Sequence, residues 1–362
     1  MPSHPPFSPL CLGPAAVLLA AITLATGHPS RSAAQPASRP DRVHVVERIL
    51  QHAPQADTDG DGTLDAAEVR AFMQQRRDAR GDAGANRPDP TESDLSYGDH
   101  ERHRIDLYLP PDAKGPTPLV VYYHGGGFTS GDKARVSPAL IAAMHQEGIA
   151  VAAANYRLCT TDPLPAAMHD GARAIQTLRA RADRFNLDPD RIAVTGASAG
   201  PGIALWIALH DDLADPASDD PVARQSTRVT VAQVQQAQVT YDPRAWIELG
   251  LERAVNRRPF PELFGHDAQT PYESPDLAAA AEASSPLHFL TADDPPLRFD
   301  YGVAARLDAN TPIGNLIHHP NHGLAMQQAC QPLEVPCEVH HAESGPPAET
   351  AEAFLIRHLQ PG

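Results

Sequence analysis

The stretch "VTGASAG", residues 194–200, places a serine between two glycines at the end of an apolar run. A nucleophilic serine on a sharp strand-to-helix turn needs small neighbours, because side chains on either side would collide with the backbone. Gly196 and Gly200 supply them on the two sides of Ser198. The stretch therefore predicts a strand, a tight turn and a helix, with Ser198 as the candidate nucleophile. A core strand that merely ends in a glycine turn would give the same letters, so a second motif is needed.

That second motif is "HGGGF" at residues 124–128. It follows the apolar run "PLVVYY" and precedes the serine by about 70 residues, the order that an α/β-hydrolase fold requires. Consecutive glycines let the main chain approach a substrate, so that its N–H groups can donate to a developing oxyanion. We expect the N–H groups of Gly126, Gly127 and Ala199 to form this oxyanion hole, and His124 to have a structural role. Together the two motifs predict an α/β-hydrolase fold.

Residues 95–362 alternate between apolar, strand-like runs and helical patterns, which is typical of βαβ units and a mostly parallel central sheet flanked by helices. Strands are expected at "RHRIDLYLP", "PLVVYYHGG", "IAVAAANYRL", "RIAVTGAS", "VTVAQVQQAQV", "PPLRFDYG" and "CEVHHAE", and helices at 164–184, 199–210, 321–331 and 348–359. Residues 243–284 interrupt this alternation and predict a lid or side insertion.

An acidic loop, "DTDGDGTLDAAE" at residues 57–68, has the spacing of a calcium-binding loop. Calcium takes about six to eight hard oxygen ligands, and Gly62 permits the sharp turn that wraps the chain around the ion. The expected ligands are Asp57, Asp59, Asp61, the Thr63 carbonyl, Asp65 and Glu68. The segment 42–78 resembles the EF-hand family, which implies a small N-terminal helical unit that binds Ca²⁺. An acidic solvated turn without an ion is the alternative.

The N-terminus has the pattern of an export signal. Residues 11–25, "CLGPAAVLLAAITLA", form an apolar run suited to a signal-peptide core, and "SAAQ" at 32–35 supplies a small-x-small cleavage site. Residues 1–34 are therefore predicted to be a signal peptide, which makes the mature protein secreted or periplasmic. A disordered apolar N-terminus is the alternative. Residues 79–94 are polar, contain glycine and proline, and predict a linker to the domain at 95–362.

The net charge limits the classes of partner that the protein can bind, and the cysteines limit the disulfides that it can form. The net charge of −16 disfavours nucleic acid and anionic membrane surfaces, since both attract basic proteins. No stable membrane insertion is expected once the signal is cleaved. In an oxidising compartment Cys330 and Cys337 could close a local disulfide and leave Cys159 unpaired. Two free cysteines in a buried region would give the same pattern.

The motifs between residues 95 and 300 resemble those of the α/β-hydrolase superfamily. They are "RHRIDLYLP", "YYHGGGFTSGDK", "ANYRL", "HDGARAIQTLR", "DPDRIAVTGASAG" and "SPLHFLTADDPP". Within that superfamily they resemble carboxylesterases related to hormone-sensitive lipase and to bacterial feruloyl or acetyl-xylan esterases. The resemblance implies hydrolysis of small-molecule acyl esters by a serine carboxylesterase, with no cofactor needed for catalysis.

The other two members of a Ser–His–Asp triad are displaced from the positions that this family uses. Family members carry the acid in a Gly-x-x-Asp turn after the next strand, where "DYGVAARLDANTP" offers Asp308 first and Asp300 second. The base belongs in a glycine-rich turn after the last strand, where "ESGPP" contains no histidine. The histidines that follow Asp308 are His318, His319, His322, His340, His341 and His358. His341 lies nearest to the end of the last strand and is the predicted base.

Two functions remain open on these observations. The first is an exported serine carboxylesterase with Ser198, Asp308 and His341 as its triad. The second is a catalytically impaired, α/β-hydrolase-like calcium-binding protein that has lost the triad histidine. The imidazole that lies within hydrogen-bond reach of the Ser198 hydroxyl, if there is one, decides between them.

Overall fold

A computed structural model describes residues 68, 87–113, 115–257 and 260–360. The chain divides into two units, residues 1–74 and 75–362, and the elements described below belong to the second. The predicted signal peptide lies outside the described residues, and so does the predicted calcium loop except for Glu68. Glu68 has helical backbone and a buried side chain.

The second unit is built on an eight-stranded sheet with the order β1-β2-β4-β3-β5-β6-β7-β8. β1 and β2 pair antiparallel with their neighbours, whereas the strands from β4 to β8 run parallel. The strands are β1 Glu92–Ser96, β2 Arg104–Tyr108, β3 Thr117–Tyr123, β4 Ala150–Ala154, β5 Leu187–Ala197, β6 Val231–Gln235, β7 Leu297–Asp300 and β8 Cys337–His340. All the strands expected from the sequence are present, and this mostly parallel sheet is the one that the α/β pattern predicts.

β1 moves the boundary between the predicted linker and the hydrolase domain. The linker interpretation covers residues 79–94, but Glu92 pairs with Leu107 of β2 and Leu95 pairs with Ile105. Residues 92–94 therefore belong to the edge of the sheet. The sequence pattern does not predict this strand, because "ESDLS" is polar and only Leu95 is buried.

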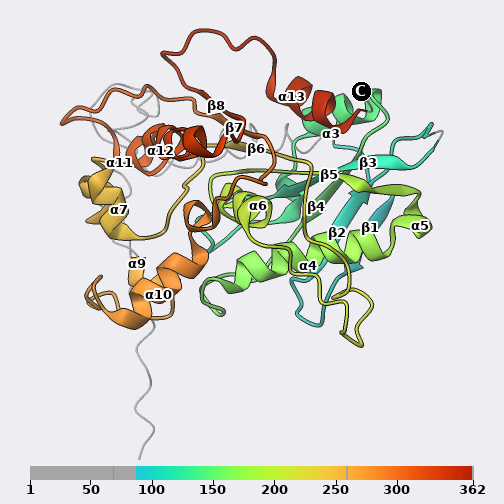
Figure 1. The fold of residues 1–362 in the computed structure, drawn as a ribbon, viewed down its shortest axis with the longest axis horizontal. Helices are drawn as coiled ribbons and strands as arrows, with labels where there is room; N and C mark the ends of the chain where they lie inside the picture. The colour runs from blue at the N-terminus through green and yellow to red at the C-terminus, as the bar shows by residue number, and fades with distance from the viewer. Residues whose placement is uncertain (1–67, 69–86, 114, 258–259, 361–362) are drawn as a thin grey trace, which may run out of the picture. The chain divides into compact units, whose positions relative to one another are not determined.

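Both faces of the sheet are covered, and the buried side chains alternate between them as the two-residue period of a strand requires. On β3, Val120 faces the cluster formed with α3 (Pro138–Gln146) and α13 (Ala351–Leu359), whereas Val121 faces the cluster formed with α4 (Ala166–Ala180) and α6 (Gly200–Leu209). Figure 1 shows α3 with α13 on one side of the sheet and α4 with α6 on the other. A short helix, α5 (Ala182–Phe185), follows α4, and a 3-10 turn at Lys133–Arg135 precedes α3.

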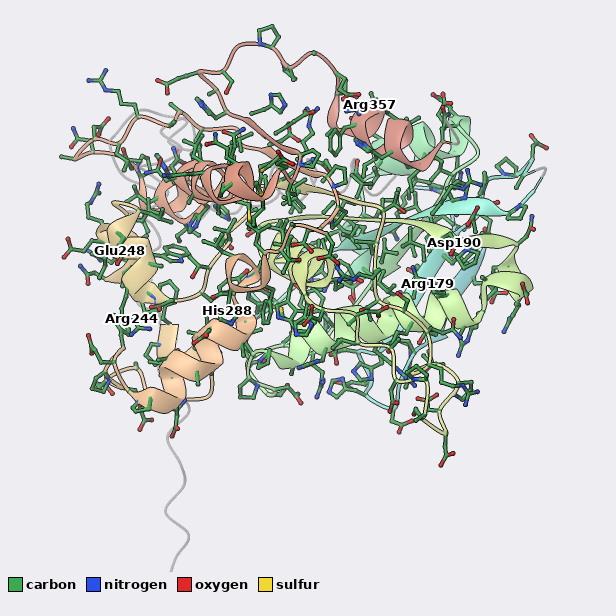
Figure 2. All side chains as sticks on the ribbon, viewed as in Figure 1. Arg179, Asp190, Arg244, Glu248, His288 and Arg357 are labelled. Carbon is green, nitrogen blue, oxygen red and sulfur yellow. The ribbon has the colours of Figure 1, made fainter. Side chains whose placement is uncertain are left out.

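The connection from β6 to β7, where the sequence predicts a lid or side insertion at 243–284, is mainly helical. It holds α7 (Pro243–Glu248), α8 (Glu252–Val255), α9 (Phe260–Leu263) and α10 (Pro275–Ser284), followed by a 3-10 turn at Pro286–Phe289. In Figure 2, Arg244 and Glu248 mark α7, while Arg179 on α4 and Asp190 on β5 mark the opposite side of the view. Trp246 and Phe260 are fully buried and pack edge to face at 5.0 Å, so the insertion has its own apolar contacts.

The connection from β7 to β8 contains α11 (Ile313–Ile317), α12 (Asn321–Cys330) and a 3-10 turn at Gln331–Leu333. Cys330 ends α12 and Cys337 begins β8. Both are free cysteines in this structure, so the disulfide considered from the sequence is not formed here. Within the described ranges, no helix has both the length and the apolar character that a membrane crossing requires.

Candidate active site

Ser198 occupies the turn between β5 and α6. Its φ is +62°, in the left-handed region that a residue with a side chain rarely adopts. A Cβ atom added to Gly196 would lie 2.7 Å from the Tyr123 carbonyl oxygen, and one added to Gly200 would lie 2.0 Å from it. The expectation that both glycines are required by close backbone approach is therefore confirmed. The Ser198 N–H donates to the Gln235 carbonyl at 3.0 Å, which ties the turn to the end of β6.

The glycine loop lies beside this turn because β3 and β5 are neighbours in register, with Tyr123 opposite Gly196. A Cβ atom on Gly125 would lie 3.1 Å from the Ser198 Cβ, so the loop passes directly over the serine. Gly126 and Gly127 have φ values of +135° and +63°, which turn their amide planes away from the strand. Within the described residues, no hydrogen bond takes the N–H of Gly126, Gly127 or Ala199. Gly125 is thus the residue of the loop that lies against Ser198, and Ala199 is its neighbour in the chain.

His124 stabilises the glycine loop through contacts of its ring and its carbonyl. Arg102 donates to its Nε2 at 3.2 Å, so Nδ1 carries the proton and donates to the Gly125 carbonyl at 2.9 Å. The ring stacks on Tyr156 at 4.2 Å, and Tyr156 donates its hydroxyl to the His124 carbonyl at 2.6 Å. Burial lowers the pKa of His124 to about 4, and the Arg102 charge acts in the same direction. The imidazole is thus neutral and structural at neutral pH.

A second imidazole faces the serine. His318 follows α11, and its Nε2 lies 2.8 Å from the Ser198 Oγ. Its Nδ1 lies 2.9 Å from the Gly314 carbonyl oxygen, one turn earlier in the same segment. A carbonyl only accepts, so Nδ1 must carry the proton of the neutral ring and Nε2 must be free to accept from the serine hydroxyl. This is the tautomer that a general base needs.

The structure places His318 at the Ser198 hydroxyl, whereas the predicted base, His341, lies in the turn after β8. His341 accepts from the Glu343 N–H at 3.3 Å, in the exposed turn after β8. His340 contacts Glu338 at 3.3 Å, and His358 lies on α13 with its Nδ1 on the Phe354 carbonyl. The base candidate therefore precedes the last strand instead of following it.

The acid candidates also make contacts of their own. Asp308 is exposed, and its Oδ1 accepts from the Asn310 N–H at 2.6 Å within its own turn. Asp300 binds Arg298 through both carboxylate oxygens at 2.9 Å and accepts from Gln233 at 2.9 Å. One acceptor that orients the His318 ring is a backbone oxygen, that of Gly314. Sequence patterns carry no signal for such a contact, because any residue provides a carbonyl.

Comparisons with known proteins identify the family. The BD-FAE family matches residues 105–304. The carboxylesterase NlhH of Mycobacterium tuberculosis is 32% identical over 182 residues, which are 49% of this chain and 55% of the relative. The probable isoprenylcysteine alpha-carbonyl methylesterase ICMEL1 of Arabidopsis thaliana is 32% identical over 135 residues, which are 37% of this chain and 28% of the relative. The chain therefore spans about half or less of the length of these curated relatives.

A solved structure supports the fold. The thermophilic esterase Est2 of the Planctomycetes species Thermogutta terrifontis, with propionate bound, superposes with a TM-score of 0.52 at 21% identity, over 74% of this chain and 90% of that one. With the mostly parallel sheet and its flanking helices, this likeness confirms the predicted α/β-hydrolase fold.

The buried His124 predicts a pH dependence of stability. Its pKa in the folded protein is about 4, below the ordinary value of about 6.5 that it regains on unfolding. Between pH 4 and 6.5 the unfolded chain therefore binds a proton at His124 more readily than the folded protein does. The contribution of the neutral His124 to the free energy of unfolding is complete above pH 6.5 and is lost as the pH falls toward 4. The loss amounts to roughly 3 kcal/mol. Urea unfolding of the wild type and of His124→Asn at a series of pH values measures it.

The difference between the two proteins is the informative quantity. Burial raises the pKa of Asp294 to about 6, which gives a contribution of opposite sign in the same pH window, but that contribution is common to both proteins. The free energies of unfolding should converge as pH falls from 6.5 to 4. A difference that stays constant across this range would show that His124 takes up its proton in the folded state without penalty.

Proposed function

The chain belongs to the BD-FAE family, and on this premise we propose that it is a serine carboxylesterase that hydrolyses small acyl esters. The observation that carries the proposal is the 2.8 Å separation between the Ser198 Oγ and the His318 Nε2, beside the glycine loop. An unassisted serine hydroxyl is a poor nucleophile at neutral pH, and a positioned imidazole is what activates it. We therefore infer that the histidine absent from "ESGPP" is replaced by one at another position in the chain, His318.

The acylation step follows from these positions. The Ser198 Oγ attacks the acyl carbonyl carbon while the His318 Nε2 accepts the hydroxyl proton. The carbonyl oxygen gains negative charge and is held by the N–H groups of Gly126, Gly127 and Ala199. The C–O bond to the alcohol then breaks, and His318 returns the proton to the leaving alkoxide. An acyl group remains on Ser198.

Hydrolysis of the acyl-enzyme repeats the sequence with water as the nucleophile, and His318 removes its proton. In both steps the imidazole becomes positively charged while its Nδ1–H points at the Gly314 carbonyl. The negative end of that carbonyl dipole favours the charged ring and prevents it from rotating. In a triad this role belongs to a carboxylate.

The relatives support an ester as the substrate, because NlhH is named a carboxylesterase and ICMEL1 a probable methylesterase. Aromatic residues make up 5% of the sequence, which offers little stacking surface for an extended sugar chain. We therefore place a short acyl group in the site.

Activity on p-nitrophenyl acetate tests the assignment. Ser198→Ala removes the nucleophile and His318→Gln removes the base, so each should lower kcat/KM by roughly 10⁴-fold or more. Asp308→Asn and His341→Gln are the matched controls, because both side chains make other contacts. They should stay within about 3-fold of the wild type.

Two outcomes would contradict the assignment. If His341→Gln abolishes turnover while His318→Gln preserves it, the base is His341 after all. If a serine-directed fluorophosphonate leaves Ser198 unlabelled at neutral pH, the serine is not activated. The chain would then be the catalytically impaired, calcium-binding alternative.

We also propose that residues 57–68 bind Ca²⁺, since every oxygen position of an EF-hand loop is filled in the sequence. Titration calorimetry on the full chain should detect a calcium-dependent heat in the wild type. Glu68→Gln should lose it, because the bidentate carboxylate is gone, and Glu101→Gln in the hydrolase unit should retain it. Equal heats for Glu68→Gln and the wild type would contradict the site.

Export is the third part of the proposal, supported by the apolar run at residues 11–25 and the "SAAQ" site. Protein isolated from its native cell should then begin near Gln35. Intact-mass measurement of the periplasmic or secreted fraction checks this. A full-length chain found in the cytoplasm would contradict export.

A further inference from the structure

We infer that Gln238 is a positioning residue that holds His318 opposite Ser198. The inference rests on the proposed function, because it assigns a residue to the same reaction. Gln238 lies three residues beyond the end of β6, and its side chain is 1% exposed. A buried carboxamide has to find hydrogen-bond partners, so the partners it finds show what it holds in place.

Both partners identified for the Gln238 amide are backbone carbonyls. Its Nε2 donates to the Ile317 oxygen at 3.1 Å and to the Gln236 oxygen at 3.2 Å. Ile317 is the residue immediately before His318 and the last residue of α11. The last carbonyls of a helix have no partner within the helix, so the Gln238 amide satisfies one of them. The same bond fixes the peptide group from which the His318 backbone continues.

The second bond of the Gln238 amide, to Gln236, links the His318 segment to the turn that holds Ser198. Gln236 follows Gln235, whose carbonyl accepts the Ser198 N–H at 3.0 Å. The backbone of Gln236 is left-handed, with φ of +56°, and its N–H donates to the Asp300 carbonyl at 2.9 Å. Residues 235–238 therefore form one anchored turn that holds the nucleophile through Gln235 and the base segment through Gln238. The 2.8 Å contact between the two catalytic side chains depends on both ends of this turn.

α11 has only five residues, Ile313–Ile317, and a helix of this length is not stable by itself. Without the Gln238 amide, the end of α11 loses its tie to the turn after β6 and frays, so the bond that the His318 ring makes to Gly314 at the other end of this helix is no longer held in one geometry. A displacement of about 1 Å between reacting groups can lower a rate by roughly 10²-fold. Gln238→Ala should therefore lower kcat by about 10- to 100-fold. It should leave KM within about 2-fold, because Gln238 acts on the position of His318 and not on substrate binding.

Gln233, on β6 itself, provides a matched control. It is 2% exposed and hydrogen-bonds to Thr195 and Asp300. Gln233→Ala removes an equally buried glutamine with no bond to the base segment. It should cost a similar amount of stability, measured by urea unfolding, while kcat stays within about 3-fold of the wild type.

Gln238→Glu separates positioning from packing. The side chain keeps its size, but an ionised carboxylate donates no hydrogen bond, whereas the protonated acid donates one. The ratio of the wild-type kcat to the variant kcat should therefore fall as the pH is lowered. A purely structural role would leave this ratio independent of pH.

A readout without substrate distinguishes this inference from the proposed esterase activity. The Nδ1 proton held between His318 and Gly314 should give a downfield ¹H NMR signal, identified by its loss in His318→Gln. The signal should persist in Gln233→Ala and be broadened or lost in Gln238→Ala. If the wild type shows this pattern but no turnover of any ester, the esterase proposal fails and the positioning role stands. If Gln238→Ala keeps the signal, or matches Gln233→Ala in kcat, the inference is overturned.

Discussion

The close approach of the β5–α6 turn to the end of β3 is the constraint on which the site depends. At Gly196 and Gly200 the turn comes so near to the Tyr123 carbonyl that neither residue can carry a side chain, and Ser198 is held with φ of +62°. A left-handed serine costs about 1–3 kcal/mol, and it persists only where the surrounding structure determines it. Here α6, which is buried at every residue, and the bond from Ser198 to Gln235 determine it. The same approach places the glycine loop over the serine, so one packing contact forms both the Ser198 turn and the loop that we propose as the oxyanion hole.

The two halves of the site are held by different kinds of structure. The serine and the glycine loop follow neighbouring parallel strands, whose carboxyl ends meet at one edge of the sheet, so their proximity follows from strand register. The histidine has no strand beside it. His318 depends on a five-residue helix, on the Gly314 carbonyl and on a glutamine from the end of β6. The Gly314 carbonyl at Nδ1 fixes the tautomer and the orientation of the ring, and its partial charge stabilises an imidazolium less than the full charge of a carboxylate would.

This difference explains what the sequence could predict. The strands, the insertion at 243–284, the role of the two glycines around Ser198 and the structural role of His124 depend on local patterns or on a chain order that physical constraints impose. The edge strand at Glu92–Ser96 was concealed because a polar strand resembles a linker. The base could not be selected, since six histidines follow Asp308 and their distances to Ser198 depend on how the β7–β8 connection folds back. The calcium loop and the export signal are still predictions from sequence.

The insertion contributes to the position of the base as well. α8 packs against α11, and Asn321 at the start of α12 donates its side-chain amide to the Leu249 carbonyl in the insertion at 2.8 Å. The segment between α11 and α12, which includes His318, is therefore held from the insertion on one side and from Gln238 on the other. A change in the insertion that altered the packing of α8 against α11 would therefore also move the His318 imidazole.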